Sequence, residues 1–279
     1  MIRLIAIDID GTLLDSRGQL PEANRAAIAA ARRRGIAVAL VTGRSFHFAR
    51  PIGTLLDDDV TLIVNNGAII RSVTGETVAR RLLPRAVARA LLTAADEYRP
   101  DAAVIFDRPV AGQVVYDRMD WTHANRRGYF EKNRAYLARV PDLAVTLAEE
   151  DEDPIQVMFS GGVARMRELL DCLTGLPTAS ACAVALTEYA HRDFSLVDVL
   201  TRDCSKGTAL ADWAASLGVT AGETMAVGDN LNDREMLTFA GVPVVMGNAS
   251  PELKASGWHV TATNDEAGLA AAITALALS

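Results

Sequence analysis

Short apolar runs separated by amphipathic stretches dominate the first part of the chain. Residues 4–9, 36–41 and 60–64 are rich in isoleucine, valine and leucine, as expected for strands that are covered on both faces. A helical pattern between the first two runs begins at Pro21 and stops at Gly35. The order strand, helix, strand, helix, strand predicts a parallel sheet with right-handed crossovers.

The same pattern returns near the C-terminus. Residues 205–217 are predicted to form a helix, which Gly218 ends. A strand ending at Asp229, a helix over "REMLTFAG" and a strand over "VPVVMGNA" follow. We therefore assign residues 1–83 and 201–279 to a single α/β domain.

The middle of the chain, residues 84–200, has a different pattern. Its segments are longer, more charged and less regular than those on either side. Helical stretches over residues 86–98 and 164–173 alternate with strands such as "QVVYD" and "IQVMFS". The pattern predicts an inserted second domain of α+β character.

Composition narrows the class of protein. Half of the 279 residues are hydrophobic, as is typical of a globular protein. The net charge of −7 argues against nucleic acid as the main partner. The three cysteines have no C-x-x-C spacing, so neither a disulfide framework nor a zinc site is expected. No apolar run approaches the length of a membrane span, and no leader is recognised, so we expect a cytoplasmic protein without a membrane partner.

Polar clusters stand where the predicted strands end. Asp8 and Asp10 follow the first strand, the segment 42–44 (Thr-Gly-Arg) follows the second, and Asp229 and Asp233 follow a later one. Each cluster alone could be a turn or a helix cap, and a lone lysine such as Lys206 is usually solvated. Parallel sheets, however, place their sites at the carboxyl ends of strands, and the start of the helix at Lys206 faces the same edge. The conjunction predicts one site.

Four carboxylates in one pocket would repel one another. Asp8, Asp10, Asp229 and Asp233 would therefore bind a proton or a cation, and Lys206 alone is too little positive charge. Because the ligands are oxygens without cysteine or histidine, Mg²⁺ is favoured over zinc. With Mg²⁺ and Lys206 the site becomes locally attractive to a phosphate, in spite of the negative net charge.

Two carboxylates two residues apart suit covalent phosphoryl transfer. As residues i and i+2 of a strand, Asp8 and Asp10 would project to the same side. Asp8 can attack phosphorus, while Asp10 can protonate the leaving oxygen and later deprotonate water. We assign phosphate and substrate binding to a set of polar and basic residues: Thr42, Gly43, Arg44, Lys206 and Asn232.

These motifs resemble a known family. "DIDGTLLD", "VTGR", "CSKG" and "GDNLNDREML" resemble, in order and spacing, the four motifs of haloacid dehalogenase (HAD) superfamily phosphatases. The insertion after "NNGA" and the segment "GVPVVMGNASPELK" are similar to the Cof-like subgroup, which has a large α/β cap. The resemblance implies a Rossmann-like core with a mobile cap that closes over the site. "ASGWHV" departs from the subgroup, but it lies away from the four motifs.

The resemblance also implies roles for individual residues. Asp8 would be the nucleophile and Asp10 the acid and base. Mg²⁺ would be held by the Asp8 side chain, the Asp10 carbonyl and Asp229, with support from Asp233. Thr42 and Lys206 would bind phosphate, as the residue pattern also suggests.

Other conspicuous residues leave alternatives open. Arg44 would contact either the substrate or an aspartate, or else lie on the surface. The segment 120–133 combines aromatic rings with Arg126, Arg127 and Lys132, and would either line the substrate side of the cap or be solvated. The four histidines are expected to be structural: His47, His123, His191 and His259.

The leading hypothesis is a Mg²⁺-dependent phosphomonoesterase that acts on small phosphorylated metabolites, with sugar phosphates as the expected substrates. A phosphomutase would use the same aspartyl-phosphate but return the phosphoryl group to the substrate. A non-catalytic phospho-acceptor, similar to a response-regulator receiver, would need neither a cap nor Asp10 and Lys206 together. The chain is expected to be a monomer or a small homo-oligomer.

Overall fold

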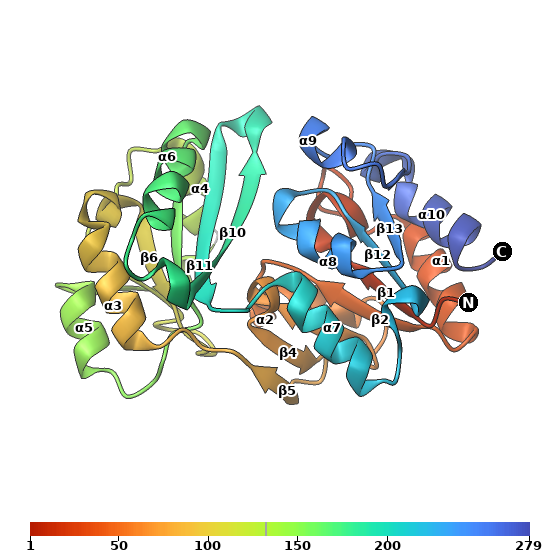
Figure 1. Cartoon of the computed structure of the whole chain (residues 1–279), viewed down its shortest axis with the longest axis horizontal. Coiled ribbons are helices and arrows are strands. Elements are labelled where there is room, and N and C mark those ends of the chain that lie inside the picture. The colour runs from red at the N-terminus through yellow and green to blue at the C-terminus, as the bar shows by residue number, and fades with distance from the viewer. Residues whose placement is uncertain (132) are drawn as a thin grey trace. The chain divides into compact units, whose positions relative to one another are not determined.

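The chain forms two compact units (Figure 1). The computed structural model describes residues 1–131 and 133–279, so Lys132 of the aromatic and basic segment lies outside the described residues. Unit 1 comprises Met1–Arg80 and Cys204–Ser279, and unit 2 comprises Arg81–Asp203. The sequence places the borders after residues 83 and 200, whereas the contacts place them after 80 and 203.

Unit 1 is built on a sheet with the strand order β14-β13-β12-β1-β2-β3-β4-β5. The strands are β1 (Leu4–Ile7), β2 (Ala37–Val41), β3 (Thr61–Val64), β4 (Ile69–Ser72), β5 (Thr77–Arg80), β12 (Thr224–Gly228), β13 (Val242–Val245) and β14 (His259–Val260). The pairings from β14 to β3 are parallel, as predicted. β4 and β5 add an antiparallel hairpin that the sequence pattern did not predict.

β1 lies between β2 and β12, and Ile7 is in register with Leu40 and Val227. The chain leaves β1 toward β2 and returns to β12 on the other side, so the strand order reverses here. Such a point opens a crevice at the carboxyl ends of the strands. The residues after Ile7, Val41 and Gly228 are therefore brought to one edge.

Helices cover both faces of this sheet. They are α1 (Glu22–Arg33), α2 (Phe46–Thr54), α7 (Lys206–Ser216), α8 (Arg234–Phe239), α9 (Pro251–Lys254) and α10 (Gly268–Leu276). Leu4 and Ala6 of β1 share one core with Leu210 of α7 and Leu237 of α8. Because strand side chains alternate, Ile5 and Ile7 point to the other face, where α1 packs against α10.

Unit 2 contains a second sheet, with the strand order β10-β11-β9-β6-β7-β8. Its strands are β6 (Ala102–Ile105), β7 (Val114–Tyr116), β8 (Leu137–Arg139), β9 (Gln156–Gly161), β10 (Cys182–Tyr189) and β11 (Phe194–Thr201), and its helices are α3 (Arg85–Ala94), α4 (Ala124–Glu131), α5 (Leu143–Glu149) and α6 (Val163–Thr174). All pairings are antiparallel except β7 with β8. The predicted α/β class with an inserted α+β domain is confirmed.

One hydrophobic core joins α3, α5 and α6 to the sheet of unit 2. Leu91 of α3, Leu147 of α5 and Leu169 of α6 pack with Val157 and Val197 of the central strands. The helix predicted over residues 86–98 ends earlier, at Ala94, and a 3₁₀ turn over Asp96–Asp101 follows. Pro100 in this turn lacks an N–H group and disfavours helix for the residue before it.

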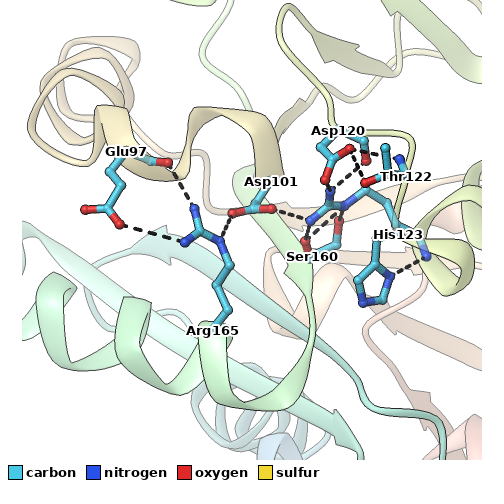
Figure 2. A network of polar contacts seen from close by, with 8 residues as sticks. Glu97, Asp101, Asp120, Thr122, His123, Ser160 and Arg165 are labelled. Atoms are coloured by element: carbon cyan, nitrogen blue, oxygen red, sulfur yellow. Dashed lines mark hydrogen bonds and ion pairs between the residues drawn. The ribbon is translucent and has the colours of Figure 1, made fainter.

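A network of polar contacts, buried around Asp101, ties elements of unit 2 together (Figure 2). Arg126 of α4 is 1% exposed, and its guanidinium pairs with Asp101 and donates to both oxygens of Ser160. Asp101 also accepts from Arg165 Nε at 2.6 Å. Arg126 is therefore not solvated, which was one of the two alternatives for its segment, because its guanidinium finds its partners inside the unit.

The structure also places the cysteines and one of the four histidines. Cys172, Cys182 and Cys204 are free thiols, with Cys204 buried. Among the described residues, no helix has both the length and the apolar character needed to cross a bilayer. His259 lies on β14 at the edge of the sheet of unit 1 and is exposed.

Candidate functional site

The two acids that follow β1 occupy a tight turn. The backbone N–H of Asp8 still belongs to the sheet and donates to the Val227 carbonyl at 3.0 Å. A π-helical turn then spans Ile9–Leu13, and Leu13 N–H donates back to the Asp8 carbonyl at 3.1 Å. Gly11 has a φ of +81°, and a Cβ there would lie 2.3 Å from Asp229 Oδ2. A glycine is therefore required for Asp229 to approach this turn.

Lys206 lies at the centre of the site. It is the first residue of α7 and is 1% exposed, and Ser205 before it caps the helix through Thr208. Its Nζ donates to Asp8 Oδ1 at 2.6 Å and to Asp233 Oδ1 at 2.5 Å. A buried ammonium is stable only with such partners, so the lysine joins loops that are far apart in the chain.

Asp233 organises the loop that follows β12. It is fully buried, and its second oxygen, Oδ2, accepts the backbone N–H groups of Asp229 and Asn230, both at 3.0 Å. The Asp229 side chain is held by Thr12 Oγ1, which donates to Asp229 Oδ1 at 3.1 Å. Both carboxylates are thus fixed before any ligand binds.

Three carboxylates converge next to the lysine. Asp8, Asp229 and Asp233 each offer one oxygen, and these oxygens lie within 4.8 Å of one another. Burial, followed by the charge of Asp233, raises the pKa of Asp8 to about 8. Burial and then the charge of Asp8 raise the pKa of Asp229 well above its ordinary value.

The charge of Lys206 does not balance this group. Burial lowers the pKa of Lys206, but the charges and hydrogen bonds of Asp233 and Asp8 outweigh that effect and raise it, so the lysine stays protonated. One ammonium faces three carboxylates, and two of these have raised pKa values. An all-oxygen group with surplus negative charge fits a hard divalent cation such as Mg²⁺.

The fourth predicted carboxylate has a different partner. Asp10 Oδ2 accepts from Arg44 Nε at 2.7 Å, and Asp10 Oδ1 accepts from an Arg44 terminal nitrogen at 2.6 Å. The structure therefore places Arg44 against an aspartate, which was one of the roles open from the sequence. The Asp10 side chain is outside the group of three carboxylates.

The loop after β2 is held by a neighbouring turn that the sequence analysis did not assign to the site. Thr42 is 1% exposed, and its carbonyl accepts the Asn66 N–H at 3.0 Å. The Asn65 N–H donates to the Arg44 carbonyl at 2.9 Å. Asn65 and Asn66 have φ values of +49° and +52°, a conformation that asparagine tolerates better than most residues. The signal in the sequence was "NNG" directly after an apolar strand.

Asn66 also connects two predicted site loops. Its Oδ1 accepts from Asn232 Nδ2 at 2.9 Å, and Asn232 lies between Asp229 and Asp233 in the chain. A Cβ on Gly43 would lie 3.3 Å from the same Asn66 oxygen. Asn248 was missed as well: its Nδ2 donates to the Gly11 carbonyl at 2.9 Å and so supports the turn after Asp8.

Gly67→Ala is expected to disturb both this turn and Lys206. Gly67 has a φ of +100°, and a Cβ there would lie 2.1 Å from the Ser205 carbonyl oxygen. We expect strain and overlap together to lower the free energy of unfolding by about 2–4 kcal/mol, measured by chemical denaturation.

Gly35→Ala is the matched control for this substitution. It has a similar φ of +77°, but no described heavy atom lies within 4 Å of its Cβ position. We expect Gly35→Ala to lower the free energy of unfolding by about 1 kcal/mol. Equal losses in the two variants would show that contact with Ser205 does not matter.

Comparisons with known proteins were consistent over nearly the whole chain. A model of the haloacid dehalogenase-like hydrolase family matches residues 5–273. The chain is 31% identical to phosphatase YwpJ of Bacillus subtilis (strain 168), over 96% of this chain and 98% of that protein. It is 33% identical to the HMP-PP phosphatase of Enterobacter sp. (strain 638), over 93% of this chain and 89% of that protein. A solved haloacid dehalogenase-like hydrolase from B. subtilis is 27% identical, with a TM-score of 0.80 over 99% of this chain and 100% of that one.

Proposed function

This chain belongs to the haloacid dehalogenase-like hydrolase family and is a phosphatase, and on that premise we propose that it is a Mg²⁺-dependent phosphomonoesterase working through an aspartyl-phosphate on Asp8. Its proposed substrates are small phosphorylated metabolites, sugar phosphates in particular. The observation that carries the proposal is the buried contact of Asp8 with Lys206 beside two further carboxylates.

The proposed reaction has two steps. First, an Asp8 carboxylate oxygen bonds to phosphorus, the bond from phosphorus to the leaving oxygen breaks, and the Asp10 carboxyl proton goes to that oxygen. Second, a water oxygen bonds to phosphorus, the bond from Asp8 to phosphorus breaks, and Asp10 takes the proton of the water. Asp8 and Asp10 thereby regain their starting states, and one water is consumed for each phosphate released.

Asp8, Asp229 and Asp233, together with the Asp10 carbonyl, are the proposed ligands of Mg²⁺. When bound, the ion would offset the negative charge of the carboxylates and of the phosphoryl oxygens. Lys206 is already placed beside the nucleophile at 2.6 Å, so it adds a fixed positive charge at the same point.

Thr42, Gly43 and Asn232 are the proposed donors to the phosphoryl oxygens. Thr42 is buried at the end of β2, where its Oγ1 also accepts the Arg44 N–H at 3.1 Å. That contact orients the hydroxyl oxygen and leaves its proton for another acceptor. Asn232 is positioned by Asn66. Donors fixed before the reaction favour the charge that develops during phosphoryl transfer.

The test is release of inorganic phosphate from a panel of sugar phosphates, HMP-PP and p-nitrophenyl phosphate in the presence of Mg²⁺. We expect release by the wild-type protein and none above background by Asp8→Asn. Product analysis by ³¹P NMR should show free phosphate. Isomerised sugar phosphate in its place, or a phosphorylated protein that does not turn over, would contradict hydrolysis.

A further inference from the structure

Arg44 and Asp10 form a two-point contact between the loops that follow β1 and β2. The Nε and one terminal nitrogen of the guanidinium bind the two carboxylate oxygens, at 2.7 and 2.6 Å. The two side chains are 31% and 41% exposed, so the pair is neither sealed in the core nor fully solvated. Parallel hydrogen bonds of this kind fix the plane of the carboxylate as well as its position.

The backbone of Arg44 is fixed on both sides. Its N–H donates to Thr42 Oγ1 at 3.1 Å, and its carbonyl accepts the Asn65 N–H at 2.9 Å. Asp10 lies in the turn after β1, whose last residue, Ile7, is in register with Leu40 of β2. The contact therefore joins two adjacent loops, and each of them is held by the sheet.

We propose that Arg44 is a positioning residue for Asp10 and not a ligand of the phosphoryl group. This inference rests on the proposed function, in which Asp10 gives a proton to the leaving oxygen and takes one from water. The Asp10 carboxyl group rotates about two single bonds, and only some of its orientations reach the leaving oxygen or the water. The two parallel hydrogen bonds from the Arg44 guanidinium select the orientation. A lysine would supply the positive charge but not the two parallel hydrogen bonds to the carboxylate.

Two substrates with different leaving groups separate this role from phosphate binding. An alkyl phosphate needs a proton on its leaving oxygen, whereas p-nitrophenolate leaves without one. The value of kcat/KM reports the steps up to formation of the phosphoenzyme. Arg44→Met should lower kcat/KM by about 100-fold for the alkyl phosphate but by less than about 5-fold for p-nitrophenyl phosphate. For the aryl substrate kcat should fall further, because the water step still needs Asp10.

Three further variants sharpen the test. Adding Arg44→Met to Asp10→Asn should cause no additional loss of kcat/KM for the alkyl phosphate, since the residue to be positioned is already disabled. Arg44→Lys should fall between wild type and Arg44→Met. Arg32→Met removes an arginine that pairs with Asp57 and Asp59 away from the carboxyl ends of the strands, and should change kcat/KM for neither substrate.

Equal losses of kcat/KM on both substrates, or a further loss in the double variant, would overturn the inference and make Arg44 a phosphate ligand. A wild-type protein that releases no phosphate would instead contradict the proposed function. Thermal unfolding of each variant separates loss of fold from loss of chemistry, and Arg44→Lys provides the same comparison if Arg44→Met unfolds.

Discussion

Asp8→Asn is expected to lower kcat/KM by at least about 10⁴-fold for every phosphorylated substrate. The amide keeps the shape of the carboxylate but cannot bond to phosphorus as a nucleophile. The fold should survive, because the amide keeps an oxygen where Asp8 Oδ1 accepts from Lys206 Nζ. The loss should therefore appear in turnover and not in the secondary structure.

The decisive measurement is intact-protein mass after an acid quench during turnover. The wild-type protein should gain the mass of one phosphoryl group, and Asp8→Asn should not. Asp265→Asn is a suitable control, because Asp265 accepts the Ser16 N–H at 2.8 Å on the surface of the same unit. If the Asp8→Asn protein were still phosphorylated, the nucleophile would have to be a residue other than Asp8.

Much of the site could be predicted because it follows from strand order. Asp8, Thr42 and Asp229 each stand one residue beyond a buried strand, and parallel strands in register bring such residues to one edge. Lys206 follows from the same rule, since it opens a helix that leads back into the sheet. The class and the family predicted from these motifs are confirmed.

Contacts between side chains far apart in the chain could not be predicted. The bond from Asn232 to Asn66 spans 166 residues, and neither residue has a pattern that indicates the other. The paired hydrogen bonds between Arg44 and Asp10 could not be predicted either, because the sequence was compatible with several roles for Arg44. Arg126 shows the same limit in unit 2: an arginine beside other polar residues resembles a solvated face, yet it is 1% exposed.

The hairpin of β4 and β5 was missed for a local reason. β4 has two buried residues followed by Arg71 and Ser72, and β5 is mostly exposed. Short strands at or next to the edge of a sheet bury little apolar surface, so their hydrophobic pattern is weak. The pairing depends on β3, to which β4 adds in antiparallel register, from Thr61 with Ser72 to Val64 with Ile69.

Removal of divalent metal is expected to abolish turnover and to make the stability of the protein depend on pH. In the metal-free protein the pKa of Asp8 is about 8, whereas the ordinary value is 3.8. Between these values the folded state holds a proton that the unfolded chain has released, so the contribution of Asp8 to stability is greatest at or below about pH 4 and falls as pH rises toward 8. The loss for Asp8 is on the order of 5 kcal/mol, and the raised pKa of Asp229 acts in the same direction.

Mg²⁺ should reverse this loss, because it binds the deprotonated carboxylates. We expect saturating Mg²⁺ to raise Tm by at least about 5 °C near pH 8 and by much less near pH 5, as measured by differential scanning calorimetry after treatment with a chelator. Asp8→Asn serves as the control, because its neutral amide should reduce the pH dependence of the metal-free protein to the part that Asp229 contributes. A Mg²⁺ effect on Tm that is the same at both pH values would mean that the ion does not bind at the group formed by Asp8, Asp229 and Asp233, since binding there has to displace the protons that these carboxylates hold at low pH.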